Sequence, residues 1–256
     1  MESELRCGLA SYIGFELDPL NSENNEPFIE RLVNFYKLKP GSQTPSILPE
    51  GLMCQLLLVA HVFHEKLPNV VRVNRALVRK NNAASRGDLT IVGDLHGQYH
   101  DFAQIFQNPK IGGYPSDQNQ FIFNGDMVDR GSMGVEIMVV LMFCNMLYPQ
   151  SVHILRGNHE TRSTTAKYGF QKEVEAKYNS GMYLFFMVFF DTLPIAAVVD
   201  DKVFVTHGGI GPSVANLTIE ELNKEHRIGE VASDTVIGDL LWAGLSHVFI
   251  SASYHF

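Results

Sequence analysis

The chain has 256 residues, of which 45% are hydrophobic and 19% are charged, as in a globular protein with a substantial core. Its formal net charge of -8 argues against binding nucleic acid through bulk electrostatic attraction. No basic segment precedes a long apolar run at the N-terminus, and the most apolar helical pattern, residues 135–148, is too short to span a bilayer. We therefore expect no contact with nucleic acid or membrane. Three widely spaced cysteines without a CxxC pair favour a reducing compartment, the cytoplasm or the nucleus.

The N-terminal part of the chain changes character near residue 26. Residues 1–26 are rich in Asn, Glu, Ser and Pro and predict a loosely ordered leader. Apolar residues at helical spacing then predict helices over 27–38 and 50–67, separated by a segment rich in turn-forming residues.

From residue 88 onward, strand patterns alternate with helix patterns. Strands are predicted over 88–94, 119–126 and 151–158, with helices over 98–107 and 133–148 between them. This βαβαβ order is typical of a layered α/β fold.

Two further adjacent strands and a helix follow these elements. The strands cover 194–200 and 202–209, and Asp200-Asp201 predicts a tight hairpin between them. A helix is predicted to begin at Thr218, with Glu221 in the position that closes a capping box.

Polar motifs follow four of the predicted strands. They are GDLHG at 93–97, NGDMVDRG at 124–131, RGNHE at 156–160 and THGG at 206–209. The carboxyl ends of parallel strands lie along one edge of a sheet, so we expect these loops to meet in one crevice. The candidate site residues are Asp94, His96, Asp126, Asp129, Arg130, Asn158, His159 and His207.

The candidate residues share a chemistry that suits a metal site. Taken singly, each has an ordinary explanation as a turn former, a helix cap or a surface ion pair. Four motifs at four strand ends favour a common site instead. Carboxylates, imidazoles and an amide oxygen without cysteine are ligands for Mn, Fe or Zn.

These motifs also resemble those of a known family. GDLHGQYHD, FNGDMVDRGS, ILRGNHET and HGGI resemble the metal-dependent serine/threonine protein phosphatases, the phosphoprotein phosphatase family, and their surroundings look most like its type-5 branch. The resemblance runs from about Phe28 to Trp242. It implies a calcineurin-like metallophosphoesterase fold, in which a layered β-sandwich is flanked by helices. It also implies a catalytic domain over 27–242 and a tail over 243–256 without family resemblance.

The resemblance assigns a metal-binding role to five residues. It implies that Asp94 and His96 hold a first divalent metal ion and that Asn158 and His207 bind a second. Asp126 would bridge the two ions. The cofactors implied are therefore two divalent cations, Mn, Fe or Zn.

The resemblance also implies the reaction and its other participants. A metal-activated water would hydrolyse phosphoserine and phosphothreonine in phosphoprotein substrates. His159 would be the general acid, oriented by Asp129. Arg130 and Asn158 would bind the substrate phosphate, and regulatory proteins are expected as further partners.

Two alternatives remain open beside this interpretation. Beyond Trp242 the family pattern stops, whereas members of the family continue into a portion that supplies another histidine ligand, another arginine and further strands. We therefore expect a sandwich truncated at its C-terminal strands. The first alternative is a non-catalytic remnant that binds phosphoproteins or regulatory partners. The second, a nuclease or nucleotide hydrolase, is disfavoured because GDMVDRG together with RGNHET is specific to protein phosphatases.

Overall fold

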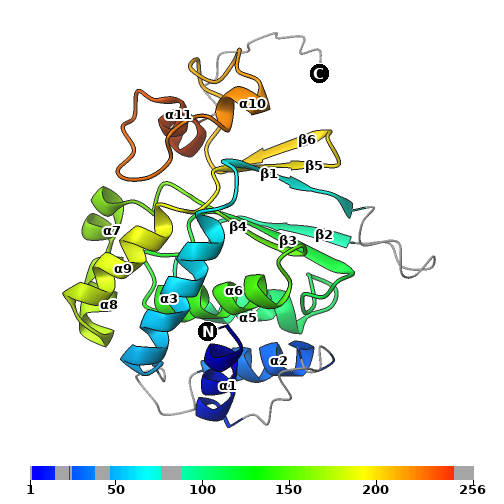
Figure 1. Ribbon diagram of the computed structural model, residues 1–256, viewed down its shortest axis with the longest axis vertical. Coiled ribbons are helices and arrows are strands. Elements are labelled where there is room, and N and C mark those ends of the chain that lie inside the picture. The colour runs from blue at the N-terminus through cyan, green and yellow to red at the C-terminus, as the bar shows by residue number, and fades with distance from the viewer. Residues whose placement is uncertain (1, 15–22, 24, 38–46, 76–87, 245–256) are drawn as a thin grey trace.

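Two three-stranded sheets lie face to face between two groups of helices (Figure 1). The computed structural model describes residues 2–14, 23, 25–37, 47–75 and 88–244. Within these residues, the helices are all too short or too polar to cross a membrane.

The first sheet carries the predicted βαβαβ order. Its strands β2 (Asp88–Val92), β3 (Asn119–Asn124) and β4 (Val152–Leu155) run parallel, with β3 in the centre. Helices α5 (Tyr99–Gln107) and α6 (Gly134–Leu147) connect them. The strands and helices predicted for this part of the chain are confirmed.

The second sheet has a different topology. Strand β5 (Ala196–Val199) pairs in parallel with β1 (Val70–Val73) and antiparallel with β6 (Val203–Thr206). Strand β1 was not predicted. The expectation that all four motif-bearing strands end at one edge of a single parallel sheet holds for β2, β3 and β4 and is wrong for β6, which belongs to the opposite sheet.

The hairpin between β5 and β6 is confirmed at the predicted dipeptide. Asp200 and Asp201 have φ of 50° and 54°. They are the central residues of a turn that the N–H of Lys202 closes by donating to the Val199 carbonyl at 2.9 Å. Aspartate tolerates positive φ better than most residues.

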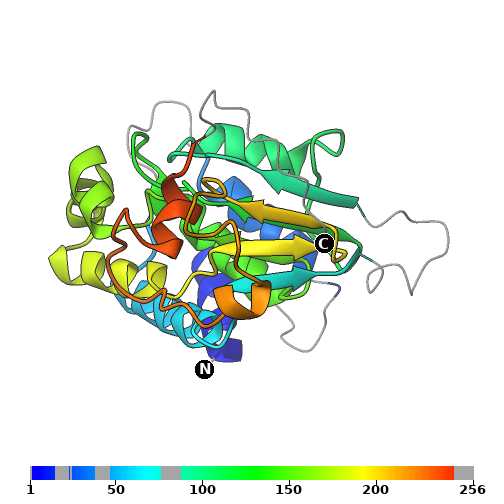
Figure 2. The ribbon, with the colours of Figure 1, turned by 90° about the horizontal axis from the view of Figure 1, so that it is seen from above.

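The core has three parts because each sheet is apolar on both faces. The second sheet lies over the first when the molecule is seen from above (Figure 2). Between the sheets, Ile122 and Leu155 pack with Val71, Ala197 and Val199. The outer face of the first sheet packs against α5 and α6 and the helices beyond them. The outer face of the second sheet is covered by α10 (Ile219–Leu222) and α11 (Val236–Trp242).

The remaining helices surround the first sheet. Their bounds are α1 Glu2–Tyr12, α2 Asn25–Phe35, α3 Glu50–His64, α7 Arg162–Tyr168, α8 Phe170–Lys177 and α9 Ser180–Phe190. The predicted capping box of α10 is present, with Thr218 and Glu221 bonded reciprocally.

The N-terminal helix corrects one expectation. Residues 2–12 form α1, and its Leu5 and Leu9, together with Ile13, are at most 2% exposed within the main core. A loosely ordered leader is therefore wrong for this segment, because apolar side chains at helical spacing bury against the domain. Residues 15–22 of the predicted leader, and all but the first two residues of the predicted tail, lie outside the described part of the chain.

Candidate metal centre

Each predicted metal-binding side chain follows a strand by one to four residues. Asp94 comes two residues after β2, Asp126 two after β3, and Asn158 three after β4. His207 directly follows β6 and so reaches the same crevice from the second sheet. The site is therefore built where the carboxyl ends of strands from both sheets meet.

The loops of the site have an unusual backbone. Non-glycine residues with positive φ include His96 (44°), Asp126 (57°), Asp129 (70°) and Arg130 (62°). Such conformations are costly for side-chain-bearing residues and persist only where surrounding contacts hold them. Here the two loops bond to each other, since the backbone N–H groups of Leu95 and His96 both donate to the Asp126 carbonyl at 2.9 Å.

Glycines allow the loops to approach closely. Gly125 has φ of 86°, and a Cβ there would lie 2.9 Å from Nδ1 of His207 and against the backbone of Gly157. A Cβ at Gly157 would collide with the Asp126 side chain. These two positions exclude larger residues because the backbone itself forms the wall of the site.

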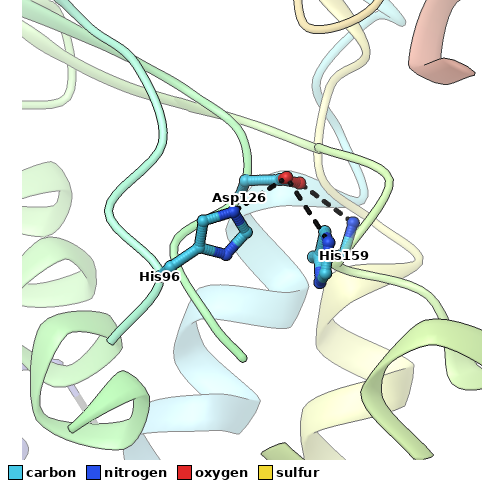
Figure 3. A group of neighbouring side chains, drawn as sticks. All are labelled: His96, Asp126 and His159. Carbon is cyan, nitrogen blue, oxygen red and sulfur yellow. Dashed lines mark hydrogen bonds and ion pairs between the residues drawn. The ribbon is translucent and has the colours of Figure 1, made fainter. Parts of the chain in front are cut away.

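The Asp126 carboxylate lies at the centre of the cluster. Its Oδ1 is 3.3 Å from Nε2 of His207, and its Oδ2 is 3.5 Å from Nε2 of His96. Asp94 approaches from the more exposed side, with Oδ2 3.7 Å from Nε2 of His96. His96 and His159 extend from separate loops toward the same carboxylate (Figure 3).

In the part of the chain that the structure describes, two sets of three side chains are close enough to share a cation. One is Asp94, Asp126 and His207, and the other is His96, Asp126 and His159. Asp126 belongs to both, as expected of a bridging carboxylate. The grouping differs from the predicted one, because Asp94 is placed with His207 and not with His96. The second set also includes His159, for which the sequence predicted a role in proton transfer and not in metal binding.

Backbone contacts orient the ligand nitrogens. Nδ1–H of His96 donates to the Val128 carbonyl at 2.9 Å, and Nδ1–H of His207 donates to the Asn124 carbonyl at 2.8 Å. Because a carbonyl only accepts, the free lone pair of each ring is on Nε2, the nitrogen that faces Asp126. Metal-binding histidines are commonly fixed in this way.

Buried atoms without partners test whether a metal ion fits. Nε2 of His96 and Oδ1 of Asn158 are buried and have no hydrogen-bond partner among the described residues. Leaving a buried acceptor unpaired costs about 1–3 kcal/mol, so such atoms call for a ligand. Both atoms, and the carboxylate oxygens beside them, have lone pairs that can coordinate divalent Mn, Fe or Zn. The residues therefore fit a divalent metal centre.

His159 lies beside the cluster in a chain of contacts. Its Nδ1–H donates to Oδ2 of Asp129 at 2.8 Å, and Oδ1 of Asp129 accepts the backbone N–H of Phe170 at 2.8 Å. Burial lowers the pKa of His159, but the bond to Asp129 and the negative charges of Asp126, Asp129 and Glu160 outweigh it, so the pKa is raised above its ordinary value.

An arginine and a tyrosine lie next to His159. Nη2 of Arg130 is 3.4 Å from Nε2 of His159, and the Arg130 side chain is exposed. The ring of Tyr168 is 5.1 Å from the His159 ring, and its backbone carbonyl accepts the N–H of Arg130. Tyr168 was not predicted, because an exposed tyrosine within a helix carries no sequence signal for a site.

Glu160 is a second residue that sequence reasoning did not assign. Its fully buried carboxylate accepts the backbone N–H groups of Asp126, Met127 and Gly157 at 2.8–2.9 Å. Both oxygens act as acceptors, so the carboxylate joins the loops after β3 and β4. Burial, followed by the charge of Asp126, raises its pKa. The sequence did contain one indication of its importance, because Glu160 is the one carboxylate of the RGNHE motif and had been given no role.

Comparison with known families identifies the class of protein. Residues 88–256 match the calcineurin-like phosphoesterase family, and the chain belongs to it. The match extends past Trp242, where the sequence prediction ended the resemblance. The metallophosphoesterase fold predicted from the motifs is thereby confirmed.

Individual relatives are named serine/threonine protein phosphatases. The chain is 36% identical over 201 residues to the PP2A-like phosphatase PPG1 of Candida albicans, covering 78% of this chain and 44% of the relative. It is 42% identical over 155 residues to human serine/threonine-protein phosphatase 5, covering 60% of this chain and 30% of the relative. The chain thus spans less than half the length of either relative, and the resemblance predicted from the motifs is confirmed.

Solved structures agree with this assignment. A protein serine/threonine phosphatase from Saccharomyces cerevisiae with similarity to human PP5 superimposes with a TM-score of 0.74 at 29% identity, over 85% of this chain and 64% of that one. A cold-active protein-tyrosine phosphatase from Shewanella, at 16% identity and a TM-score of 0.54 over 82% of this chain and 66% of that one, shares the fold.

Proposed function

We propose that this protein hydrolyses phosphoserine and phosphothreonine in phosphoproteins with the help of two divalent cations, Mn, Fe or Zn. The observation that carries the proposal is the Asp126 carboxylate, which has Nε2 of His207 at 3.3 Å and Nε2 of His96 at 3.5 Å on its two oxygens. The names of the relatives support the choice of substrate.

In this proposal the ligands divide between two cation positions. Asp94 and His96 would hold the first cation, Asn158 and His207 would hold the second, and Asp126 would contribute to both. When bound, the two cations neutralise phosphoryl oxygens and lower the pKa of water from 15.7 toward ~7. The buried, unpartnered Oδ1 of Asn158 supports its inclusion beside the histidines.

His159 is proposed to protonate the departing serine or threonine oxygen. Asp129 accepts Nδ1–H at 2.8 Å, so the transferable proton would be on Nε2, which lies 3.4 Å from Nη2 of Arg130 and 3.9 Å from Oδ2 of Asp126. The raised pKa of His159 shifts the ring toward its protonated form, as a general acid requires. Its bond to the buried Asp129 keeps the ring in one orientation.

Arg130, together with Asn158, is proposed to bind the substrate phosphate. A guanidinium donates two parallel hydrogen bonds to phosphate oxygens, and Arg130 is exposed within 3.4 Å of the proposed acid. Phosphate bound there lies next to Nε2 of His159, as protonation of the leaving oxygen requires.

We further propose a cytoplasmic or nuclear protein whose partners are phosphoproteins and their regulators. All three cysteines are free thiols, and Cys144 is buried, in keeping with a reducing compartment.

The test is phosphate release by the full chain from a phosphoserine peptide and a phosphothreonine peptide, with MnCl₂ and after metal removal by chelation. We expect turnover that requires the metal and that is lost in Asp126→Asn. A bis(p-nitrophenyl) phosphate diester serves as the control substrate, because a nuclease would prefer the diester.

The outcome also separates the alternatives. Bound metal and peptide binding without phosphate release would contradict the proposal and favour a non-catalytic binding protein. Faster cleavage of the diester than of the phosphopeptides would favour a nuclease.

A further inference from the structure

The loop that carries Asp129 and Arg130 connects β3 to α6 and has a costly backbone at these two consecutive positions. Their φ angles are 70° and 62°. Residues with side chains keep this conformation only where surrounding contacts enforce it. One such contact is the N–H of Gly131, which donates to the His96 carbonyl at 2.9 Å. The other contacts that concern us come from α7 and α8.

The junction between α7 and α8 makes two of these contacts. The Tyr168 carbonyl accepts the N–H of Arg130 at 3.2 Å. The N–H of Phe170 donates to Oδ1 of Asp129 at 2.8 Å. Backbone groups of one short junction therefore contact both residues of the loop, so the placement of α8 bears directly on the placement of Asp129 and Arg130.

Lys177, the last residue of α8, makes a third contact to the same loop. Its Nζ donates to the Ser132 carbonyl at 2.7 Å. It also donates to Oε2 of Glu136 on α6 at 2.6 Å and to Oε1 of Glu173 on α8 at 2.8 Å. An ammonium group has three N–H donors, so these three acceptors use all of them.

Burial holds the Lys177 ammonium in one place. Its side chain is 14% exposed, and those of Glu136 and Glu173 are 1% and 6% exposed. A charge taken out of water is strongly destabilised when it is separated from its partners, so the two carboxylates fix the ammonium between them. The remaining N–H is thereby directed at the Ser132 carbonyl.

Glu173 also joins α8 to the first turn of α6, which directly follows the loop. Its Oε1 accepts the N–H of Val135 at 2.8 Å, and a Cβ at Gly134 would lie 3.1 Å from its Oε2. Contacts from α8 and its junction with α7 therefore reach the loop at its start, at Asp129, and again at its end, at Ser132.

We propose that Lys177 is a positioning residue that holds the loop over 129–132 through the Ser132 carbonyl. In this position Arg130 reaches the substrate phosphate and Asp129 keeps its bond to His159. The inference rests on the function proposed above for Arg130 and His159. Lys177 acts through the loop and does not itself touch the substrate.

The experiment compares Lys177→Met with a matched control on the same helix. Lys177→Met keeps much of the side-chain volume and removes the charge and all three donors. Val174→Ala is the control, because Val174 is buried in the main core and its truncation lowers stability without removing a hydrogen bond to the loop. Lys177→Arg is the conservative variant, since a guanidinium can donate to the same acceptors.

The first readout is binding of inorganic phosphate to the Mn²⁺-loaded full chain by calorimetric titration, together with phosphopeptide kinetics. In Lys177→Met we expect phosphate to bind about tenfold more weakly and kcat/KM to fall about 10²-fold, because small misplacements of positioning groups cost that much. The affinity for Mn²⁺ should not change. Lys177→Arg should restore most of both losses, and Val174→Ala should show neither.

The second readout needs neither metal nor turnover. In the metal-free chain, hydrogen exchange of the backbone N–H groups of Arg130 and Phe170 reports whether the loop stays bonded to α7 and α8. After correction for the free energy of unfolding of each variant, exchange at both positions should be about tenfold faster in Lys177→Met than in Val174→Ala.

Several outcomes would overturn the proposal. These are unchanged exchange in Lys177→Met, unchanged affinity for phosphate where the unaltered chain binds it, equal changes in Val174→Ala, and an equal loss of Mn²⁺ affinity. Each would leave Lys177 with a purely structural role. If the unaltered chain hydrolyses no phosphopeptide, the proposed function fails, whereas hydrogen exchange still decides the role of Lys177. If Lys177→Met does not fold, Lys177→Met combined with Glu136→Gln takes its place, because it leaves no unpaired charge on Glu136.

Discussion

Two histidines only six residues apart, at the two ends of β4, have opposite environments. His159 donates to Asp129 and lies among carboxylates that raise its pKa. His153 lines an apolar cavity where burial lowers its pKa to about 4. The pKa of histidine is therefore raised at the carboxyl end of β4 and lowered at its amino end. The difference comes from neighbouring charge, since both rings are largely buried.

If this contrast is correct, substitutions at the carboxyl end should remove function, whereas those at the amino end should change stability. The largest effect is expected for Asp126→Asn. The amide removes the charge that both cation positions share, so we expect phosphopeptide turnover to fall by about 10³-fold or more, in line with a loss of several kcal/mol of transition-state stabilisation. Steady-state kinetics with metal analysis measures it. Retained turnover at full metal content would refute the bridging role.

His159→Gln should have the next largest effect. Loss of a general acid lowers kcat by roughly 10²–10⁴-fold. The loss should be smaller for p-nitrophenyl phosphate than for phosphoserine peptides, because the nitrophenolate leaves without a proton.

Metal analysis of the same variant resolves the ambiguity in the geometry, in which His159 also belongs to a set able to share a cation. Full metal content supports the acid, whereas loss of one ion would assign His159 as a ligand.

Glu160→Gln tests whether this buried carboxylate holds the metal-binding loops in position. Its amide nitrogen would face backbone N–H groups that now donate to a carboxylate, so Asp126 would shift. We expect metal affinity to fall about 10–100-fold, as for other groups that orient ligands. Calorimetric titration with Mn²⁺ measures this without an activity assay.

Glu173→Gln is the matched control for this substitution. The Glu173 carboxylate accepts the backbone N–H of Val135 and pairs with Lys177. The substitution should therefore alter stability while leaving metal affinity unchanged. Equal losses of metal affinity in the two variants would mean that Glu160 acts only through stability.

The last prediction concerns stability, and not activity, at the amino end of β4. His64 and His153 have folded-state pKa values of about 4, below the ordinary 6.5. Below pH 6.5 these two histidines bind protons in the unfolded chain, whereas in the folded chain they stay neutral until the pH approaches 4. The free energy of unfolding is therefore highest above pH 6.5. It decreases as the pH falls toward 4, by about 3 kcal/mol per histidine.

Urea unfolding at pH 7.5 and pH 4.5 checks this expectation. The variant carrying His64→Leu and His153→Leu should lose less stability on acidification than the unaltered chain, and it should retain phosphatase activity at pH 7.5. Identical losses in both proteins would show that these imidazoles are not the neutral groups inferred.

The sequence predicted much of the fold where the pattern is local. The alternation of strands and helices from residue 88, the hairpin at Asp200-Asp201 and the capping box at Thr218 all depend on neighbours in sequence, and all are confirmed. Strand β1 was not predicted because its four residues form too short a pattern to be recognised from the sequence. Helix α1 was not predicted because the polar composition of residues 1–26 was given more weight than the helical spacing of Leu5, Leu9 and Ile13.

For the site, the sequence by itself determined which side chains are present and that they follow strand ends, because the motifs are contiguous. Only the tertiary structure decided how they meet. His207 arrives from the opposite sheet, Glu160 joins two loops through backbone N–H groups, and Asp126 adopts a left-handed backbone. Each of these depends on contacts between residues distant in the chain, and burial and charge at those contacts set the chemistry of each group.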